Sequence, residues 1–231
     1  MLGVVIPAHN EETGIAATLA SVARAAAHPG LEGEDVVVVV VLDACTDRTE
    51  EIARSFAVQI ARVDERNVGR ARRRGVDEAI ARGARWLAFT DADTEVAPDW
   101  LVQQLALGAD VVCGTVGADW SVLGELEHFM RAHWARTYTD ADDHRHVHGA
   151  NLGVSTQAYL AAGGFAPLAC SEDVALVDAL VRTGANVVWS AAPRVTTSAR
   201  LNARAEGGFG DTLAAVLAAA PHPHDSTVTV A

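Results

Sequence analysis

The strongest constraint on the fold is an alternation of short apolar runs with longer helical segments in the first part of the chain. The apolar runs predict buried strands at Leu2–Ile6, Val36–Leu42, Ala57–Val63 and Trp86–Thr90. The segments between them predict helices at Glu11–Ala27, about Asp47–Phe56 and Val68–Ala81. This alternation indicates right-handed crossovers and a mainly parallel central sheet flanked by helices, a three-layer α/β/α arrangement. Ligands of such sheets bind beyond the carboxyl ends of the strands.

The second part of the chain has a more mixed pattern. It predicts helices at Trp100–Leu107, Leu123–Tyr138, Val174–Arg182 and Asp211–Ala220, and strands at Asp110–Thr115, Asn151–Ser155 and Asn186–Trp189. No internal repeat or linker is visible, and 231 residues suit one sizeable core. We therefore expect a single domain over residues 1–231, with halves of about 1–95 and 96–220 and a flexible tail at 221–231.

Composition excludes several classes of protein. The net charge is −12 and lysine is absent, which argues against non-specific nucleic-acid binding and against electrostatic anchoring to a membrane. The longest apolar run, Val36–Leu42, is too short to span a bilayer, and Leu2–Ile6 is too short for the core of a signal peptide. Three widely spaced cysteines indicate reduced thiols. We expect a cytoplasmic protein without an integral membrane segment, peripheral to the membrane only if it acts on a lipid. Oligomeric state is left open.

Polar segments follow the first two predicted strands. Pro7–Glu12 either caps the next helix or holds a nucleoside against the sheet edge. It lacks the Gly-x-Gly-x-x-Gly pattern, so a dinucleotide-dependent enzyme is disfavoured. Asp43 follows seven apolar residues, and its carboxylate there could accept hydrogen bonds from a base or a ribose. Asp47 is interpreted as a helix cap.

Two aspartates with one residue between them, Asp91-Ala92-Asp93, follow the fourth predicted strand. Two like charges this close are unfavourable without a cation. A hard divalent ion, Mg²⁺ or Mn²⁺, held by carboxylate oxygen and a diphosphate would neutralise both the pair and a leaving group. The sequence therefore predicts a metal-assisted site at the end of this strand.

Six motifs, in order, resemble those of family 2 glycosyltransferases with the GT-A fold. They are Val4–Glu12, Asp43–Thr49, Asn67–Arg72, Asp91-Ala92-Asp93, the pair His148–Gly153 with Gly163–Phe165, and Ser171-Glu172-Asp173. The resemblance covers roughly residues 2–190. It implies an inverting transfer of a sugar, with a hexosyltransferase favoured, from a UDP- or GDP-activated donor to a hydroxyl acceptor. The nucleotide-sugar would bind in the first half of the chain and the acceptor in the second.

The resemblance also implies roles for individual residues. Pro7, Ala8, Asn10 and Glu12 would surround the nucleoside, with Asp43 reading the base or ribose. Asp91 and Ala92 would contact the donor, Asp93 the metal, and Asp173 would act as general base. Glu172 and Asn151 fall in the acceptor-side motifs. Glu172 and Asp173 could equally favour the start of a helix through their charge.

Arginine and histidine clusters add candidates that the motifs leave open. Only some of the arginines at 70–74 can share one helix face. They form a solvated charged face, or Arg70 or Arg73 lies near the diphosphate or the nucleoside. Arg200 and Arg204 are candidates for a loop that contacts the diphosphate. The segment Thr139–His148 either binds metal or is a solvated flexible loop. His148, next to the expected acceptor cleft, is a candidate third metal ligand or acceptor contact.

Two departures from the family pattern refine the expectation. Only one aspartate, Asp43, ends the second strand, where the family often has two. The Gln-x-x-Arg-Trp motif of processive synthases is absent and no membrane helix is visible, so a single addition is favoured over processive synthesis. A nucleotidyltransferase is an alternative, although Pro7–Glu12 lacks the glycine-rich basic loop that such enzymes carry. A catalytically silent nucleotide-sugar-binding domain is another alternative.

Overall fold

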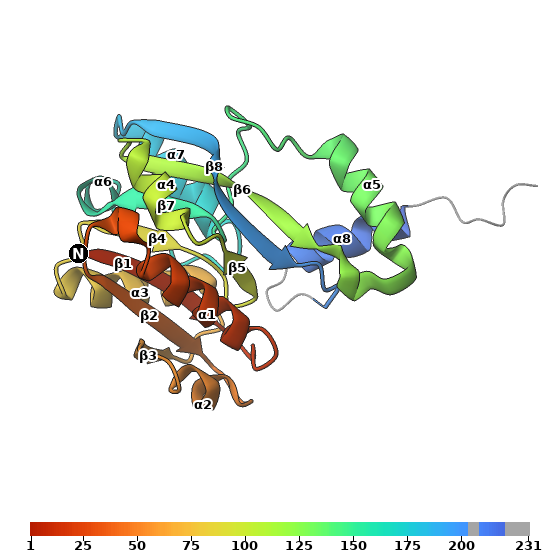
Figure 1. The fold of residues 1–231 in the computed structure, drawn as a ribbon, viewed down its shortest axis with the longest axis horizontal. Coiled ribbons are helices and arrows are strands. Elements are labelled where there is room, and N and C mark those ends of the chain that lie inside the picture. Colours follow the sequence, from red (N-terminus) through yellow and green to blue (C-terminus); the bar gives the residue numbers. More distant parts are fainter. Residues whose placement is uncertain (203–207, 220–231) are drawn as a thin grey trace, which may run out of the picture.

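The computed structural model describes residues 1–202 and 208–219, and these form one eight-stranded sheet with helices on both faces (Figure 1). The strand order is β3-β2-β1-β4-β7-β6-β8-β5. Its strands are β1 Leu2–Ala8, β2 Val36–Asp43, β3 Gln59–Val63, β4 Trp86–Phe89, β5 Thr94–Val96, β6 Val111–Asp119, β7 Leu152–Ser155 and β8 Val187–Ser198. The helices are α1 Ile15–Ala26, α2 Thr49–Ala53, α3 Val68–Ala81, α4 Trp100–Ala106, α5 Glu127–Thr137, α6 Thr156–Ala161, α7 Glu172–Arg182 and α8 Phe209–Ala218, with short 3-10 helices at Pro29–Leu31 and Trp120–Leu126.

The first four strands in space form the predicted parallel half of the sheet. β1 pairs in parallel with β2 and β4, and β2 pairs in parallel with β3. All four strands therefore end at the same edge, which brings together the segments that follow β1, β2 and β4. The second half is mixed: β7 is antiparallel to both of its neighbours, β8 is parallel to β6, and β5 is antiparallel to β8.

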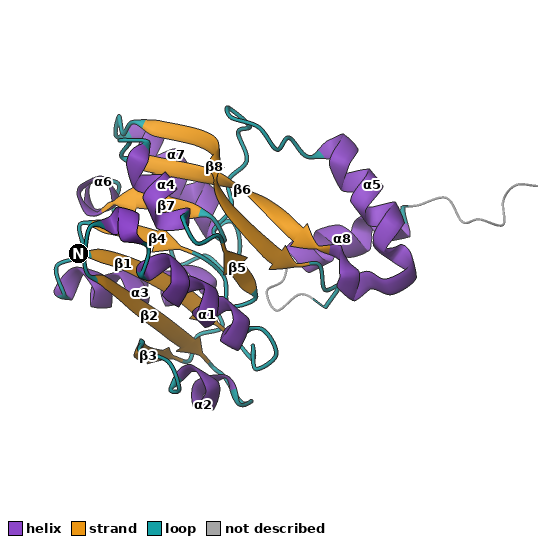
Figure 2. Ribbon diagram, in the orientation of Figure 1, coloured by secondary structure: helices purple, strands orange, loops and turns teal. Residues whose placement is uncertain are grey.

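Alternate residues of the central strands enter two apolar cores. Val4 and Ile6 of β1 face α1, α2 and α4, and Val5 faces α3, α6 and α7. Because both faces of the sheet are covered, the strands are apolar throughout. This confirms the expected α/β/α arrangement (Figure 2).

The distal halves of β6 and β8 extend beyond this body and carry a small arm. Trp120, Met130 and Leu213 are buried there in a third apolar cluster that joins the 3-10 helix after β6 to α5 and α8. Figure 1 shows α5 and α8 together at the far ends of these two strands. The expected helix Leu123–Tyr138 is broken in this arm, because Gly124 adopts φ 56° and ψ −120°.

The sequence patterns missed or shortened several other elements. β5 and α6 are not among the predicted elements, and β8 continues to Ser198 instead of ending near Trp189. Its register against β6 shifts between Gly114 and Thr115, so Ala191–Pro193 form a bulge. A bulge accommodates Pro193, which cannot donate a ladder hydrogen bond. No helix in the described part of the chain is long and apolar enough to cross a membrane.

Candidate functional site

The loops after β1 and β2 are tied together at the carboxyl edge of the sheet. The Asn10 side-chain oxygen accepts a hydrogen bond from the Thr46 amide at 2.7 Å, and the Glu12 carboxylate accepts one from the Arg48 amide at 3.1 Å. Pro7 and Ala8 are the last residues of β1 and pair with β2. All four predicted nucleoside contacts thus lie at one end of the sheet, and two of them also brace the loops. Asp47 lies one residue before Arg48, the N-cap of α2, and its carboxylate accepts a hydrogen bond from the Thr49 amide at 3.0 Å, so it bonds the first amide of the helix from outside the cap position.

Asp43 ends β2, and its carboxylate organises the turn that precedes α3. It is buried and accepts backbone hydrogen bonds from Glu65, Arg66 and Asn67, each at 2.8 Å. Two carboxylate oxygens offer about four acceptor positions, so these three bonds leave little capacity for a ligand. The geometry gives Asp43 a clear structural role, and its contact with a nucleoside stays a prediction.

Asp91 lies beside a buried arginine, Arg72 of α3. The Arg72 guanidinium is 2.6 Å from the Asp91 carboxylate and 3.2 Å from that of Glu172, at the start of α7. Only 3% of the Arg72 side chain is exposed. Burial disfavours its charge, but Asp91 and Glu172 outweigh burial and raise the pKa of Arg72. A charged side chain therefore links Asp91 to the Glu172–Asp173 pair.

Arg72 is not one of the arginines that the sequence analysis places near the donor. Arg70 is paired with Glu65 and Arg73 donates to the Phe165 carbonyl at 3.5 Å, and both side chains are exposed. The structure thus brings neither of the two predicted arginines to Asp91. Helical spacing could have indicated that Arg72 is buried, because it lies on the same face of α3 as Gly69, Val76 and Ala79, which are all buried.

Asp93 lies beside a second arginine, Arg200, in the segment after β8. The Arg200 guanidinium is 3.1 Å from the Asp93 carboxylate and also donates two hydrogen bonds to the buried Glu11 carboxylate. Burial raises the pKa of Asp93 to about 6; Arg200 opposes the rise, whereas the nearby Asp91 and Glu11 carboxylates add to it. Ala92, between the two aspartates, is buried. Arg204 lies outside the described residues.

Asp173 faces the turn at Gly149. One of its oxygens accepts from the Gly149 amide at 2.7 Å and the other from the Val174 amide at 2.8 Å. Each oxygen keeps a lone pair for a further hydrogen bond. The adjacent Glu172 is buried, and burial raises its pKa although Arg72 opposes that rise. Gly149 is required here, because a Cβ atom at this position would lie 1.6 Å from the Arg72 guanidinium.

His148 makes a hydrogen bond through one ring nitrogen, and its role as a metal ligand or acceptor contact stays a prediction. The Tyr138 hydroxyl accepts from the Val116 amide at 2.8 Å, so its own hydrogen is free to point at His148 Nε2, 3.1 Å away. Burial lowers the pKa of His148 to about 4, which keeps the ring neutral. Across residues 1–202 and 208–219, no three histidine, cysteine, aspartate or glutamate side chains gather as a metal site. Nothing in the described structure joins His148 to Asp93.

The rings of His144 and His146, within the segment Thr139–His148, stack with the ring of Tyr138. The Tyr138 and His146 rings lie 4.2 Å apart, and the His144 and His146 rings 5.3 Å apart. The His144 ring is hydrogen-bonded to the Cys113 carbonyl and to the His146 amide. His144 and His146 are therefore held in place by these contacts, whereas Thr139–Asp143 and Arg145 are exposed; metal binding by this segment stays a prediction.

Asn151 is a core residue, which corrects its expected place on the acceptor side. It is 0% exposed, and its side chain is bonded to Trp100 at 2.8 Å, the Thr115 carbonyl at 2.7 Å and the Pro193 carbonyl at 2.9 Å. These bonds hold β6, β7 and the bulge of β8 together. A buried amide with three protein partners has no exposed atom to offer a ligand.

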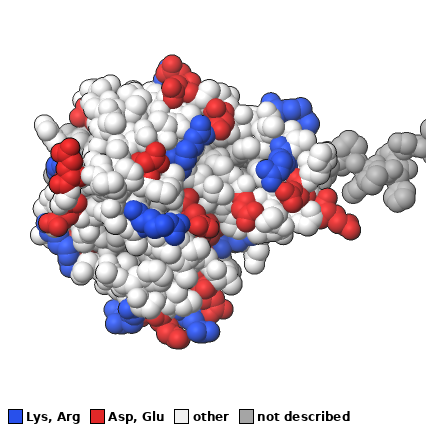
Figure 3. All heavy atoms as spheres, in the orientation of Figure 1, with Lys and Arg blue, Asp and Glu red and all other residues white. Residues whose placement is uncertain are grey.

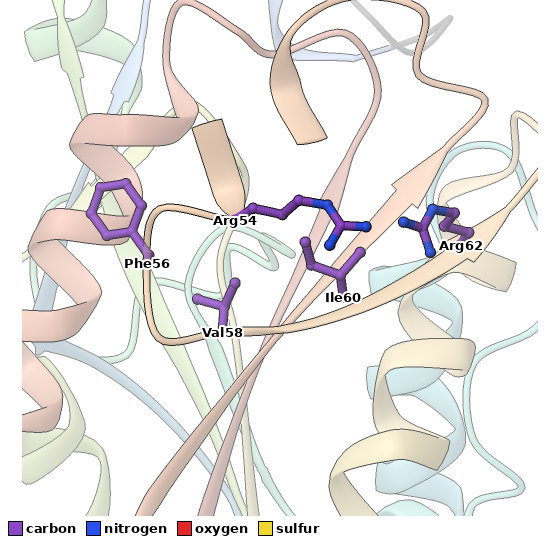
Figure 4. A pocket seen from close by; sticks show the side chains of 5 residues that line it. All are labelled: Arg54, Phe56, Val58, Ile60 and Arg62. Atoms are coloured by element: carbon purple, nitrogen blue, oxygen red, sulfur yellow. The ribbon is translucent and has the colours of Figure 1, made fainter. Parts of the chain in front are cut away.

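The face of the molecule seen in Figure 3 carries charges of both signs, and acidic and basic side chains are interspersed over it. A shallow hollow beside the edge strand β3 is lined by Arg54, Phe56, Val58, Ile60 and Arg62 (Figure 4). Both of its arginines pair with Glu50, and none of the predicted site residues lines it.

Asp91, Asp93 and Glu172 thus lie beside two arginines, Arg72 and Arg200, near the carboxyl edge of β1 and β4, whereas several other predicted site residues do not. The model of glycosyl transferase family 2 matches residues 3–159. The chain belongs to this family. The match spans the segments after β1, β2 and β4 and ends within α6, before the Glu172–Asp173 pair.

Solved structures confirm the GT-A fold. S. aureus TarS 1-349, crystallised with UDP, superposes with a TM-score of 0.63 at 16% identity over 86% of this chain and 61% of that one. Glucosyl-3-phosphoglycerate synthase from Mycobacterium tuberculosis, crystallised with Mg²⁺ and UDP, superposes with a TM-score of 0.60 at 20% identity over 94% of this chain and 78% of that one. Mannosyltransferase PcManGT from Pyrobaculum calidifontis, in complex with GDP-Man and Mn²⁺, superposes with a TM-score of 0.60 at 18% identity over 84% of this chain and 56% of that one. The chain therefore spans about 60% of the length of the TarS fragment. No curated protein matches it in a sequence comparison.

Proposed function

We propose that the chain transfers a single sugar, with inversion, from a UDP- or GDP-activated donor to a hydroxyl acceptor, assisted by Mg²⁺ or Mn²⁺. One observation carries the proposal: each aspartate of the motif after β4 lies against an arginine, and one of these arginines leads to the Glu172–Asp173 pair. Donor-binding and proton-accepting groups are thus connected within one site. The related folds crystallised with UDP or GDP-Man agree with such a donor.

The charges of the site support a metal-assisted donor. Among the described residues, five carboxylates lie beside two arginines, Arg72 and Arg200; the five are Glu11, Asp91, Asp93, Glu172 and Asp173. A diphosphate would add further negative charge, so its binding calls for another cation. Asp93 would hold that cation, and one carboxylate with diphosphate oxygens is an arrangement that Mg²⁺ commonly accepts. When bound, the metal would neutralise charge on the leaving diphosphate.

Asp173 is the proposed base. As the acceptor oxygen bonds to the anomeric carbon, the bond from that carbon to the diphosphate breaks, and the acceptor proton passes to Asp173. The two backbone amides that bond its carboxylate orient it without filling its remaining lone pairs. Arg72 holds Asp91 in position at the donor.

A donor screen tests the proposal. UDP- and GDP-sugars would be incubated with the protein and a panel of hydroxyl acceptors, with and without Mn²⁺, and nucleoside diphosphate release followed. We expect release that depends on metal and acceptor, one sugar per acceptor by mass spectrometry, and an inverted anomeric centre by NMR. Pyrophosphate release from a nucleoside triphosphate would instead favour a nucleotidyltransferase. Donor binding without any turnover would favour the silent binding domain.

A further inference from the structure

Arg200 already satisfies the carboxylate that is proposed to hold the metal. Its guanidinium is 3.1 Å from Asp93 and is paired with both oxygens of Glu11, although 189 residues separate Arg200 from Glu11. Only 25% of the Arg200 side chain is exposed, against 6% for Glu11 and 15% for Asp93. A fork of this kind is the strongest geometry for a pair of arginine and carboxylate.

The anchor of this pair is rigid. The Glu11 backbone amide donates a hydrogen bond to the Thr49 hydroxyl at 2.7 Å. The Glu11 backbone carbonyl accepts hydrogen bonds from the Gly14 and Ile15 amides at the start of α1. On the other side, one Asp93 oxygen lies 3.5 Å from the hydroxyls of Thr94 and Thr197, and the other oxygen faces Arg200. The Asp93 oxygen that could receive a cation is thus the one that Arg200 contacts.

Arg200 and a divalent ion cannot both keep this position. Two cations about 4 Å apart repel strongly in a partly desolvated site. We propose that Arg200 and the divalent ion are alternative partners of Asp93, and that Glu11 is the positioning residue that holds the guanidinium there in the donor-free protein. The proposal rests on the metal-assisted function given above and adds an exchange of cations to it.

The exchange has a consequence for binding. A metal ion alone must displace Arg200 without offering it a new partner, so metal alone binds weakly. A nucleoside diphosphate offers the guanidinium a bidentate anionic partner and offers the metal further oxygens. Metal and nucleotide therefore strengthen each other's binding, and the coupling must be reciprocal.

The test is the affinity of the full chain for Mn²⁺ in the absence of nucleotide, followed by the electron paramagnetic resonance signal of free Mn²⁺. If Arg200 occupies Asp93 in about nine molecules of ten, its removal tightens Mn²⁺ binding about tenfold. We expect this gain for Arg200→Gln and a gain of several-fold for Arg200→Lys, which keeps the charge but loses the fork. The matched control is Arg85→Gln, which removes an exposed arginine paired with Glu34. It should bind Mn²⁺ as the unmodified protein does.

Comparing Arg200→Gln with Arg200→Lys distinguishes the proposed exchange of cations from an effect of removing positive charge alone. A gain in Arg200→Gln without any gain in Arg200→Lys would overturn the proposal, because charge removal alone would then explain it. Unchanged or weaker Mn²⁺ binding in both folded variants would also overturn it, while leaving the proposed transfer intact if UDP still recruits Mn²⁺. Absence of Mn²⁺ binding to every variant even with UDP or GDP would refute both the exchange and the metal-assisted function.

Discussion

Replacing Arg72 by methionine tests the buried arginine at the centre of the site. The substitution keeps an unbranched side chain of similar length but leaves Glu172, 6% exposed, and Asp91, 37% exposed, without their shared cation. Breaking a buried ion pair from one side costs about 3–5 kcal/mol, because the remaining charge stays desolvated. Asp91 is partly solvated and contributes less, so we expect a loss of about 3 kcal/mol in the free energy of unfolding at neutral pH.

Urea unfolding of three variants gives this quantity and its cause. Arg74→Met on the same helix removes an arginine that is 46% exposed and pairs with Glu78, and it should cost less than about 0.5 kcal/mol. The double variant Arg72→Met with Glu172→Gln should recover at least about 1 kcal/mol, because it neutralises the buried charge. A cost for Arg72→Met no larger than that for Arg74→Met would refute the reasoning. So would a double variant less stable than Arg72→Met alone.

Three further predictions concern other parts of the site. The Cβ atom of Gly149→Ala would lie 1.6 Å from the Arg72 guanidinium and should push that group away from Asp91. We expect kcat/KM to fall by about tenfold or more. Unchanged steady-state kinetics would contradict this prediction. Asn151→Leu leaves the buried Trp100 N–H and two carbonyls unpaired, so it should lower the free energy of unfolding in urea by about 2–4 kcal/mol. A loss under about 1 kcal/mol would count against a structural role for the Asn151 amide. The raised pKa of Asp93, about 6, means that the folded state binds this proton more tightly than the unfolded state does. Ionised Asp93 therefore lowers stability, and the protein should regain about 2 kcal/mol from this group as pH falls from 7 to 4; Asp93→Asn should lack that gain in urea titrations, and equal pH profiles would disprove it.

The parallel half of the fold was predictable because its signals are local. The valine run in β2 and the apolar residues of β1 and β4 indicate strands that are buried on both faces of a sheet. The helix predicted at Val68–Ala81 has the same bounds as α3. β5 carries no such signal: its three residues, Thr94–Val96, are a strand only because β8 pairs with them about a hundred residues later. The continuation of β8 past Pro193 depends likewise on a bulge that the partner strand permits.

The site was predictable in its position and less so in its contacts. The edge of the sheet places Asp91 and Asp93 where the strand pattern expects them. The partners of these carboxylates lie far off in sequence, so Glu11 was missed and Arg200 was expected only as a diphosphate contact. Asn151 carries a polar side chain in a motif-like segment, and nothing local reveals that three buried groups surround it. Tertiary contacts decide both cases.

The central claim, a glycosyl transfer with Asp173 as base, is tested most directly by comparing Asp173→Asn with Asp178→Asn. Both positions lie on α7, and Asp178 is exposed. With the donor and acceptor found by the screen, both variants should bind UDP or GDP, with Mn²⁺, as tightly as the unmodified protein by calorimetry. The rate of sugar transfer at saturation should fall by a factor of about 100 or more in Asp173→Asn and stay unchanged in Asp178→Asn. Transfer at the unmodified rate by a folded Asp173→Asn variant would contradict the account.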